Sequence, residues 1–155
     1  MNIEYRSGKS TDLESILDML PRLAAFELPE KRSERELWQG DADLLRSWAN
    51  GEAPECYVRV ASEANGTIRG ACVLSLREEL LSHQPSAHLE VLVVDESAEG
   101  RGIARELLRQ TEELARQKGA LSITLHVFAN NVRARNLYEK TGFNGELMRY
   151  IRHLE

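Results

Sequence analysis

Short apolar runs along the chain predict β-strands, and one of them is typical of a strand in the middle of a sheet. The predicted strands cover residues 2–6, 56–63, 67–76, 87–94, 121–129 and 146–154. Between the second and third strands, Asn65 and Gly66 suit the type I′ turn of a hairpin. The run "AHLEVLVV" at residues 87–94 is apolar on both faces except at Glu90, which indicates an interior strand.

Helical spacing of apolar residues predicts about four helices. The stripe of the first helix is Leu13, Ile16, Leu17, Leu20 and Ala24. Thr11 and Glu14 form a capping box for it, and Pro21 should kink or restart it because proline cannot donate a backbone hydrogen bond. The later helices are expected around Leu44, Leu45 and Trp48, over residues 101–118, and within "NNVRARNLYEKTG".

The order of these elements predicts one α/β (α+β) domain. It runs strand, two helices, a meander of three strands, helix, strand, helix, strand, which makes a mixed sheet covered by helices. With 155 residues, 42% of them hydrophobic, the chain suits a single compact domain over residues 1–155 that needs no metal or disulfide to stabilise it.

The two cysteines lie in the predicted hairpin. Its register places Cys72 opposite Arg59 and Cys56 opposite Ser75, so the sulfurs are too far apart to form a disulfide. Buried, reduced cysteines agree with a reducing compartment.

Charge and hydropathy exclude several classes of partner. The formal charge is -5 with acids and bases interspersed, so no basic face suits nucleic acid. No apolar run approaches the ~18 residues that span a bilayer, and residues 1–10 lack the apolar core of a secretory signal. We therefore expect a soluble, cytoplasmic protein without a nucleic-acid or membrane partner.

Two glycines precede a predicted helix in "DESAEGRGIARELL" at residues 95–108. Gly100 and Gly102 would let an anion approach the unpaired N–H groups and the partial positive charge of the helix N-terminus. A dinucleotide fingerprint is excluded because it needs a small residue where Arg105 stands, and a P-loop ending in "SGKS" is excluded by Ile3. A plain tight turn is the alternative for the glycine pair.

Two motifs together resemble the GNAT superfamily of acyl-CoA-dependent N-acetyltransferases. The first, after the strand "LEVLVVD", is Glu99, Gly100, Arg101, Gly102, Ile103 and Ala104. The second consists of Asn131, Ala134, Leu137, Tyr138, Gly142 and Phe143. The resemblance covers about residues 87–144 closely. Glu99 departs from it, since the family usually has Arg or Gln there.

The resemblance implies a single mixed, mostly antiparallel sheet of six to seven strands, about four flanking helices, and central strands that bulge and splay apart. It implies acetyl-CoA as co-substrate and no metal. The implied coenzyme-binding residues are Leu92, Val93, Val94, Gly100, Arg101, Gly102, Ile103, Ala104, Arg105 and Asn131. Amides of residues 101–105 would hold the pyrophosphate, while residues 92–94 would pair with the pantetheine arm. Glu99 would point outward, and Arg101 and Arg105 could supply positive charge.

Acetyl transfer to an amine needs a base, because an alkylamine of pKa about 10.4 is mostly protonated at pH 7. Glu90 is one candidate, because burying a carboxylate in an apolar strand costs free energy unless it has a role or a partner. The alternative is an ion pair with an arginine of the next strand. His126 is the other candidate, because some family members place a base at this position; the alternative is a packed side chain. Tyr138 matches the family's usual proton donor to the departing thiolate. Cys56 and Cys72 lie outside both motifs.

The predicted function is acetyl transfer from acetyl-CoA to a small amine, or to a protein N-terminus or lysine. The alternatives are a non-catalytic acyl-CoA-binding sensor or interaction domain, and an unrelated phosphate-binding α/β domain. Residues 26–48 and 77–88 would shape the acceptor site, and they carry no specificity signature. Relatives are commonly dimers, so a homodimer is compatible with the resemblance.

Overall fold

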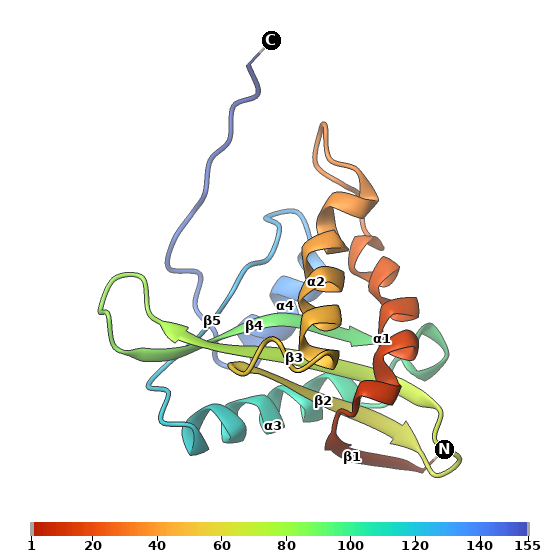
Figure 1. The fold of residues 1–155 in the computed structure, drawn as a ribbon. Coiled ribbons are helices and arrows are strands. Elements are labelled where there is room, and N and C mark those ends of the chain that lie inside the picture. The colour runs from red at the N-terminus through yellow and green to blue at the C-terminus, as the bar shows by residue number, and fades with distance from the viewer. Residues whose placement is uncertain (1, 155) are drawn as a thin grey trace.

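One mixed sheet of five strands forms the centre of the computed structural model, which describes residues 2–154 (Figure 1). In sheet order the strands are β1 (Ile3–Ser7), β2 (Cys56–Glu63), β3 (Ile68–Glu78), β4 (Pro85–Val94) and β5 (Ile123–Leu125). β1 to β4 pair antiparallel, and β5 joins β4 in parallel. The mixed, mostly antiparallel sheet is confirmed, with five strands among the described residues in place of the expected six to seven.

The C-terminal strand expected at residues 146–154 does not form. These residues belong to no helix or strand, and Figure 1 shows the C-terminal end of the chain standing away from the sheet. A strand needs a neighbouring edge for its backbone hydrogen bonds, and residues 146–154 lie beside none. β5 is also shorter than the segment 121–129 that was expected to form it.

Among residues 2–154, four α-helices lie on the two faces of the sheet, and three short 3-10 segments precede or follow helices and strands. They are α1 (Leu13–Met19), α2 (Glu34–Ala49), α3 (Ile103–Gln117) and α4 (Val132–Lys140). The 3-10 segments are η1 (Ser10–Asp12), η2 (Leu20–Ala24) and η3 (Glu96–Ala98). No helix among residues 2–154 has the length and apolar content needed to cross a membrane.

The start of the first helix differs from the expectation, whereas its end agrees with it. The capping box of Thr11 and Glu14 is wrong, because α1 follows the 3-10 turn η1 and has Asp12 at its N-cap. The Asp12 carboxylate accepts a 2.8 Å hydrogen bond from the backbone N–H of Lys9. The interruption at Pro21 is confirmed, since α1 stops and η2 restarts there.

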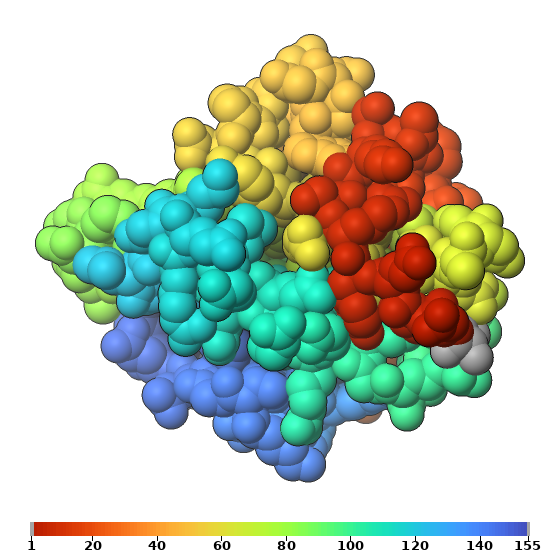
Figure 2. Space-filling view, turned by 90° about the horizontal axis from the view of Figure 1, so that it is seen from below, coloured from red at the N-terminus to blue at the C-terminus, as the bar shows by residue number. Residues whose placement is uncertain are grey.

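The core consists of two apolar layers, one on each face of the sheet. On one face, Ile16 and Leu45 of the early helices pack against Val73 of β3. On the other face, Ile103 and Leu107 of α3 pack against the opposite side of β3. Seen from below, α3 lies across the surface between the N-terminal segment and the C-terminal part of the chain (Figure 2).

The hairpin has the expected register but a different turn. Cys56 faces Ser75 and Arg59 faces Cys72, so both cysteines are free and buried, as predicted. The turn is not type I′, because Gly66 alone has positive φ there, at 92°. A register shift between Ala61 and Ser62 absorbs the difference.

Two irregularities in β4 prepare the functional site. The β3–β4 register shifts so that Glu90 is an extra residue, between Leu89 and Val91, in the manner of a β-bulge. The β4–β5 pairing ends at Leu89 and Leu125, so residues 91–94 have no strand partner on that side. β4 and the edge strand β5 therefore diverge beyond Leu89 and Leu125.

Candidate active site

A cavity of about 480 Å³ opens where β4 and β5 diverge, and it contains nearly every residue that the sequence singled out. All three catalytic candidates line it: Glu90, His126 and Tyr138. The coenzyme candidates that line it are Leu92, Val93, Val94, Gly100, Gly102, Ile103, Ala104, Arg105 and Asn131. Arg101 is exposed and is not part of the lining.

The turn before α3 has the backbone that the two glycines permit. Gly100 and Gly102 have φ values of 75° and 77°, in the left-handed region that strains any residue with a Cβ. α3 begins at Ile103, and the amide of Glu106 bonds back to the carbonyl of Gly102 at 3.0 Å. The amides of residues 103–105 precede that first bond, so they are the donors that an anion in the cavity would meet.

Glu99 lines the cavity, in place of pointing outward as expected, and two arginines neutralise it. Its carboxylate pairs with the guanidinium of Arg22, and Arg133 donates to the same oxygen at 3.2 Å. These contacts, above all the hydrogen bond from Arg133, lower the pKa of Glu99. An acid at this position is therefore compatible with an anion site, because its charge is already compensated.

Arg22 is a residue that the sequence analysis missed. Besides Glu99, it contacts the free side of β4, where its Nε donates to the carbonyl of Val94 at 2.7 Å. It lies in η2, far from both motifs in sequence, and no local pattern distinguishes it from a solvated arginine. Its position brings positive charge to the end of the cavity next to Gly100.

Tyr138 and Asn131 both belong to α4. Tyr138 packs edge-on against Phe143, with 5.8 Å between ring centroids, and burial raises the pKa of its hydroxyl to about 12. The side chain of Asn131 caps the helix by accepting a 3.3 Å hydrogen bond from the amide of Ala134. Tyr138 thus presents a protonated hydroxyl at neutral pH.

Glu90 is held at the bulge by a neighbour from the next strand. Its carboxylate pairs with the guanidinium of Arg77 on β3, and His88 Nε2 lies 3.9 Å from the same oxygen. The ion pair is the alternative that the sequence left open for Glu90, and it coexists with a place in the cavity wall.

His126 follows β5 directly, on the opposite wall of the gap. Its ring lies 4.8 Å, between centroids, from that of buried His88, whose Nδ1 is 2.7 Å from Thr124 Oγ1. Burial, and secondarily the nearby Arg77 and His126, lowers the pKa of His88 to about 4, so this ring is neutral at physiological pH. His126 is the exposed member of the pair and faces solvent as well as the cavity.

Asp41 is the second residue that the sequence analysis missed. It lies on α2 one turn after Leu37, and both line the cavity. Burial, and secondarily the charge of Glu90, raises the pKa of the Asp41 carboxyl to about 7. The available signal was its spacing, since it follows Leu37 and precedes Leu45 at four-residue intervals along the apolar side of the helix.

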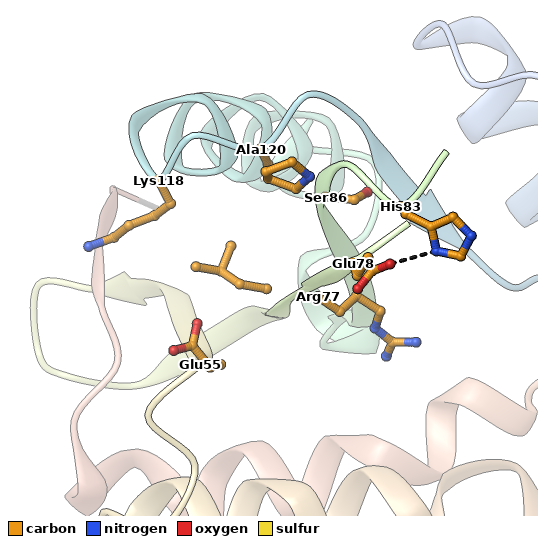
Figure 3. Close-up of a pocket in the computed structure, with 9 residues that line it drawn as sticks. Glu55, Arg77, Glu78, His83, Ser86, Lys118 and Ala120 are labelled. Carbon is orange, nitrogen blue, oxygen red and sulfur yellow. Dashed lines mark hydrogen bonds and ion pairs between the residues drawn. The ribbon is translucent and has the colours of Figure 1, made fainter. Parts of the chain in front are cut away.

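A second hollow, of about 390 Å³, contains none of the predicted site residues (Figure 3). Glu78 and His83 lie in its wall and satisfy each other, with 2.6 Å between His83 Nδ1 and Glu78 Oε1. Within residues 2–154, no group of three or more His, Cys, Asp or Glu side chains is placed to hold a metal ion. The large cavity is therefore the better candidate for chemistry.

Comparisons with known proteins support the family resemblance of the two motifs. Residues 17–143 match the family model described as Acetyltransferase (GNAT) family. A thialysine N-epsilon-acetyltransferase of Bos taurus is 29% identical over an alignment of 169 positions that covers 96% of each protein. The crystal structure of a Trypanosoma brucei acetyltransferase superposes with a TM-score of 0.69 at 26% identity, over 99% of this chain and 100% of that one. AAC(6')-Iy, in complex with the bisubstrate analogue CoA-S-monomethyl-acetylneamine, superposes with a TM-score of 0.70 at 21% identity, over 100% of this chain and 99% of that one.

Proposed function

We propose, since the chain belongs to the acetyltransferase (GNAT) family, that it moves an acetyl group from acetyl-CoA to a small primary amine by direct attack. One observation carries the proposal: the first amides of α3, the free edge of β4 and the hydroxyl-bearing Tyr138 line the same cavity. The three features correspond to the diphosphate, the pantetheine arm and the departing sulfur of one extended co-substrate.

The coenzyme fits the residues present. Amides of residues 103–105 would hold the diphosphate, with Arg105 and Arg22 adding positive charge. Residues 91–94 would pair through their backbone with the pantetheine arm on the side that β5 leaves free. When bound there, acetyl-CoA supplies the acetyl group as a thioester.

We assign the base to Glu90, acting through a water molecule. Its carboxylate is fixed at the bulge by Arg77, at the point where β4 and β5 part. Arg77 pairs with Glu90 Oε1, so a bridging water on the other carboxylate oxygen can take the proton from the amine and pass it to the carboxylate while the ion pair stays. His126, across the gap, is the second candidate.

Tyr138 is the assigned proton donor. Its raised pKa of about 12 keeps the hydroxyl protonated over the whole physiological range. A protonated phenol can donate a hydrogen bond to the sulfur as the carbon–sulfur bond breaks, and can give up its proton as negative charge develops. The buried cysteines have no part in this scheme, because burial raises the pKa of Cys56 to about 11 and that of Cys72 as well.

The proposed acceptor is a small amine with a second positive group. Asp41 and Glu90 place two carboxyl groups in one cavity, and a cationic ligand would favour the ionised form of Asp41. The names of the Bos taurus relative and of the acetylneamine complex both concern amines, which supports this acceptor class. One amino group would react after losing its proton to the base, while Asp41 binds the other as an ammonium group.

Following the release of free thiol from acetyl-CoA tests the proposal. We expect release only when an amine is present, and faster release with diamines than with monoamines. Asp41→Asn should remove the preference for diamines, whereas Asp43→Asn, an exposed acid on the same helix, should keep it. Tight coenzyme binding without thiol release for any amine would instead support a non-catalytic sensor.

A further inference from the structure

The second hollow combines an apolar surface with charged side chains around it. Its volume of about 390 Å³ lies within the range of small-molecule pockets. Leu76 of β3, Pro85 at the start of β4 and Ala120 after α3 supply the apolar surface. The charged residues that line it are Glu55, Arg77, Glu78, His83 and Lys118. This combination is typical of a site for a small polar ligand with an apolar part.

The wall of the second hollow at residues 79–84 is fixed by its own hydrogen bonds. The amide of Glu79 donates to the carbonyl of Gln84 at 2.9 Å, and the amide of His83 donates to the carbonyl of Glu79 at 3.0 Å. His83 has a φ of 62°, a left-handed conformation that costs a residue with a Cβ free energy, and its ring is held by Glu78. The hollow is therefore shaped before a ligand arrives, which lowers the cost of binding.

Glu55 and Lys118 are the two charged groups of the second hollow that no opposite charge neutralises. Neither side chain forms an ion pair with any residue between 2 and 154, and Lys118 Nζ lies 4.8 Å from the centre of the Tyr57 ring. Figure 3 shows Lys118 and Glu55 at one end of the hollow, away from the paired Glu78 and His83. One acid and one base thus line the same end without meeting each other.

We propose that the second hollow binds a small zwitterion of the free amino acid type. Its carboxylate would pair with Lys118, its ammonium group with Glu55, and its apolar side chain would lie on Leu76 and Pro85. A purely cationic ligand is repelled by Lys118 and a purely anionic one by Glu55, whereas a zwitterion satisfies both.

The second hollow and the large cavity therefore select different ligands. The acceptor end of the large cavity presents the carboxyl groups of Asp41 and Glu90, which favour a ligand with two positive groups. The second hollow presents one free charge of each sign. Binding there is independent of the chemistry assigned to the large cavity.

Titration of the full-length protein with leucine, followed by amide chemical shifts, tests the site. Leucine should bind with a dissociation constant on the order of 1 mM and should shift the amides of Leu76 and Ala120. Leucinamide and 4-methylpentanoate each lack one charge, so each should bind at least about fivefold more weakly. Equal affinity for the three compounds, or no binding of leucine, overturns the proposal.

Substitutions separate this site from the large cavity, because the amino group of leucine also makes it a potential acceptor. Glu55→Gln and Lys118→Met should each weaken leucine binding at least about fivefold and leave thiol release from acetyl-CoA unchanged. Glu52→Gln and Lys140→Met, at exposed positions outside the hollow, should bind leucine like wild type, and so should Asp41→Asn. Loss of binding in Asp41→Asn, with binding kept in Glu55→Gln and Lys118→Met, would place leucine in the large cavity and refute the second site.

Discussion

The Arg77 guanidinium on β3 is paired with the Glu90 carboxylate on β4 at the residue where the register of the two strands shifts. We predict that Glu90→Gln lowers kcat/KM by roughly 10²-fold, because it removes a positioned proton acceptor. His126→Ala should have a smaller effect and should leave the rise of kcat/KM with pH in place. Profiles of kcat/KM against pH for the two variants identify the base. A larger loss for His126→Ala than for Glu90→Gln would assign the base to His126.

Tyr138→Phe removes the assigned proton donor without changing the packing of the ring. Turnover should fall by at least about tenfold, since a general acid contributes 10²–10⁴. Coenzyme affinity should hardly change, because the diphosphate contacts lie on α3. Steady-state rates and calorimetric titration with coenzyme A measure the two effects, and unchanged turnover would remove Tyr138 from the mechanism.

Arg22 compensates Glu99 beside the proposed diphosphate site. Arg22→Ala should weaken coenzyme binding roughly tenfold, because a carboxylate that has lost one partner repels the diphosphate at close range. Arg22→Ala combined with Glu99→Gln should recover the part of this loss that comes from the uncompensated carboxylate. Calorimetric dissociation constants for coenzyme A compare the single and double variants. A double variant that binds the coenzyme no more tightly than Arg22→Ala would contradict the compensation of Glu99 by Arg22.

Gly102 needs its left-handed backbone conformation, so Gly102→Ala should cost about 1–2 kcal/mol of unfolding free energy and should also weaken coenzyme binding. Gly40→Ala is the matched control, since Gly40 lies within α2 and nothing approaches within 4 Å of an added Cβ. That control should stabilise the protein by roughly 0.5–1 kcal/mol. Denaturant unfolding measures the unfolding free energy of both variants, and an equal change in the two would argue against a strained turn at Gly102.

Asp41 should make stability depend on pH. Its folded-state pKa of about 7 lies above the ordinary value of 3.8, so the folded state holds a proton that the unfolded state releases. The contribution is complete below about pH 4 and is lost as pH rises to about 7. Melting temperatures across this window should fall less for Asp41→Asn than for wild type, and Asp43→Asn should behave as wild type. An Asp41→Asn variant with unchanged pH dependence would show that the carboxyl is not perturbed.

Features that depend on local backbone conformation could be predicted from the sequence. Gly100 and Gly102 stand where the backbone has positive φ, and Asn131 stands where its side chain caps α4, so each residue type reports its own conformation. These two short segments, with the strand before them, border the same cavity. Most of the candidate site was predictable for that reason.

Features that depend on distant neighbours were not predictable. Arg22 belongs to a helical segment where a polar side chain looks like part of a solvated face, and only the fold brings it and Asp41 to the same cavity. The pattern of residues 146–154 predicts a strand, but it does not report whether a neighbouring edge is available, and these residues form none. The turn at Asn65 and Gly66 differs for a similar reason, since the shift after Ala61 changes the geometry that it must close.

The divergence of β4 and β5 has a mechanical consequence. β5 pairs with β4 at three positions, from Ala87 and Ile123 to Leu89 and Leu125, and beyond them the two strands share no ladder. A coenzyme bound between the diverging strands would supply the hydrogen bonds that β5 does not give to residues 91–94 of β4, so it would stabilise the arrangement of the two strands. Amide hydrogen exchange along β4 and β5 should slow when the coenzyme binds. The coenzyme would then stabilise the fold as well as take part in the reaction.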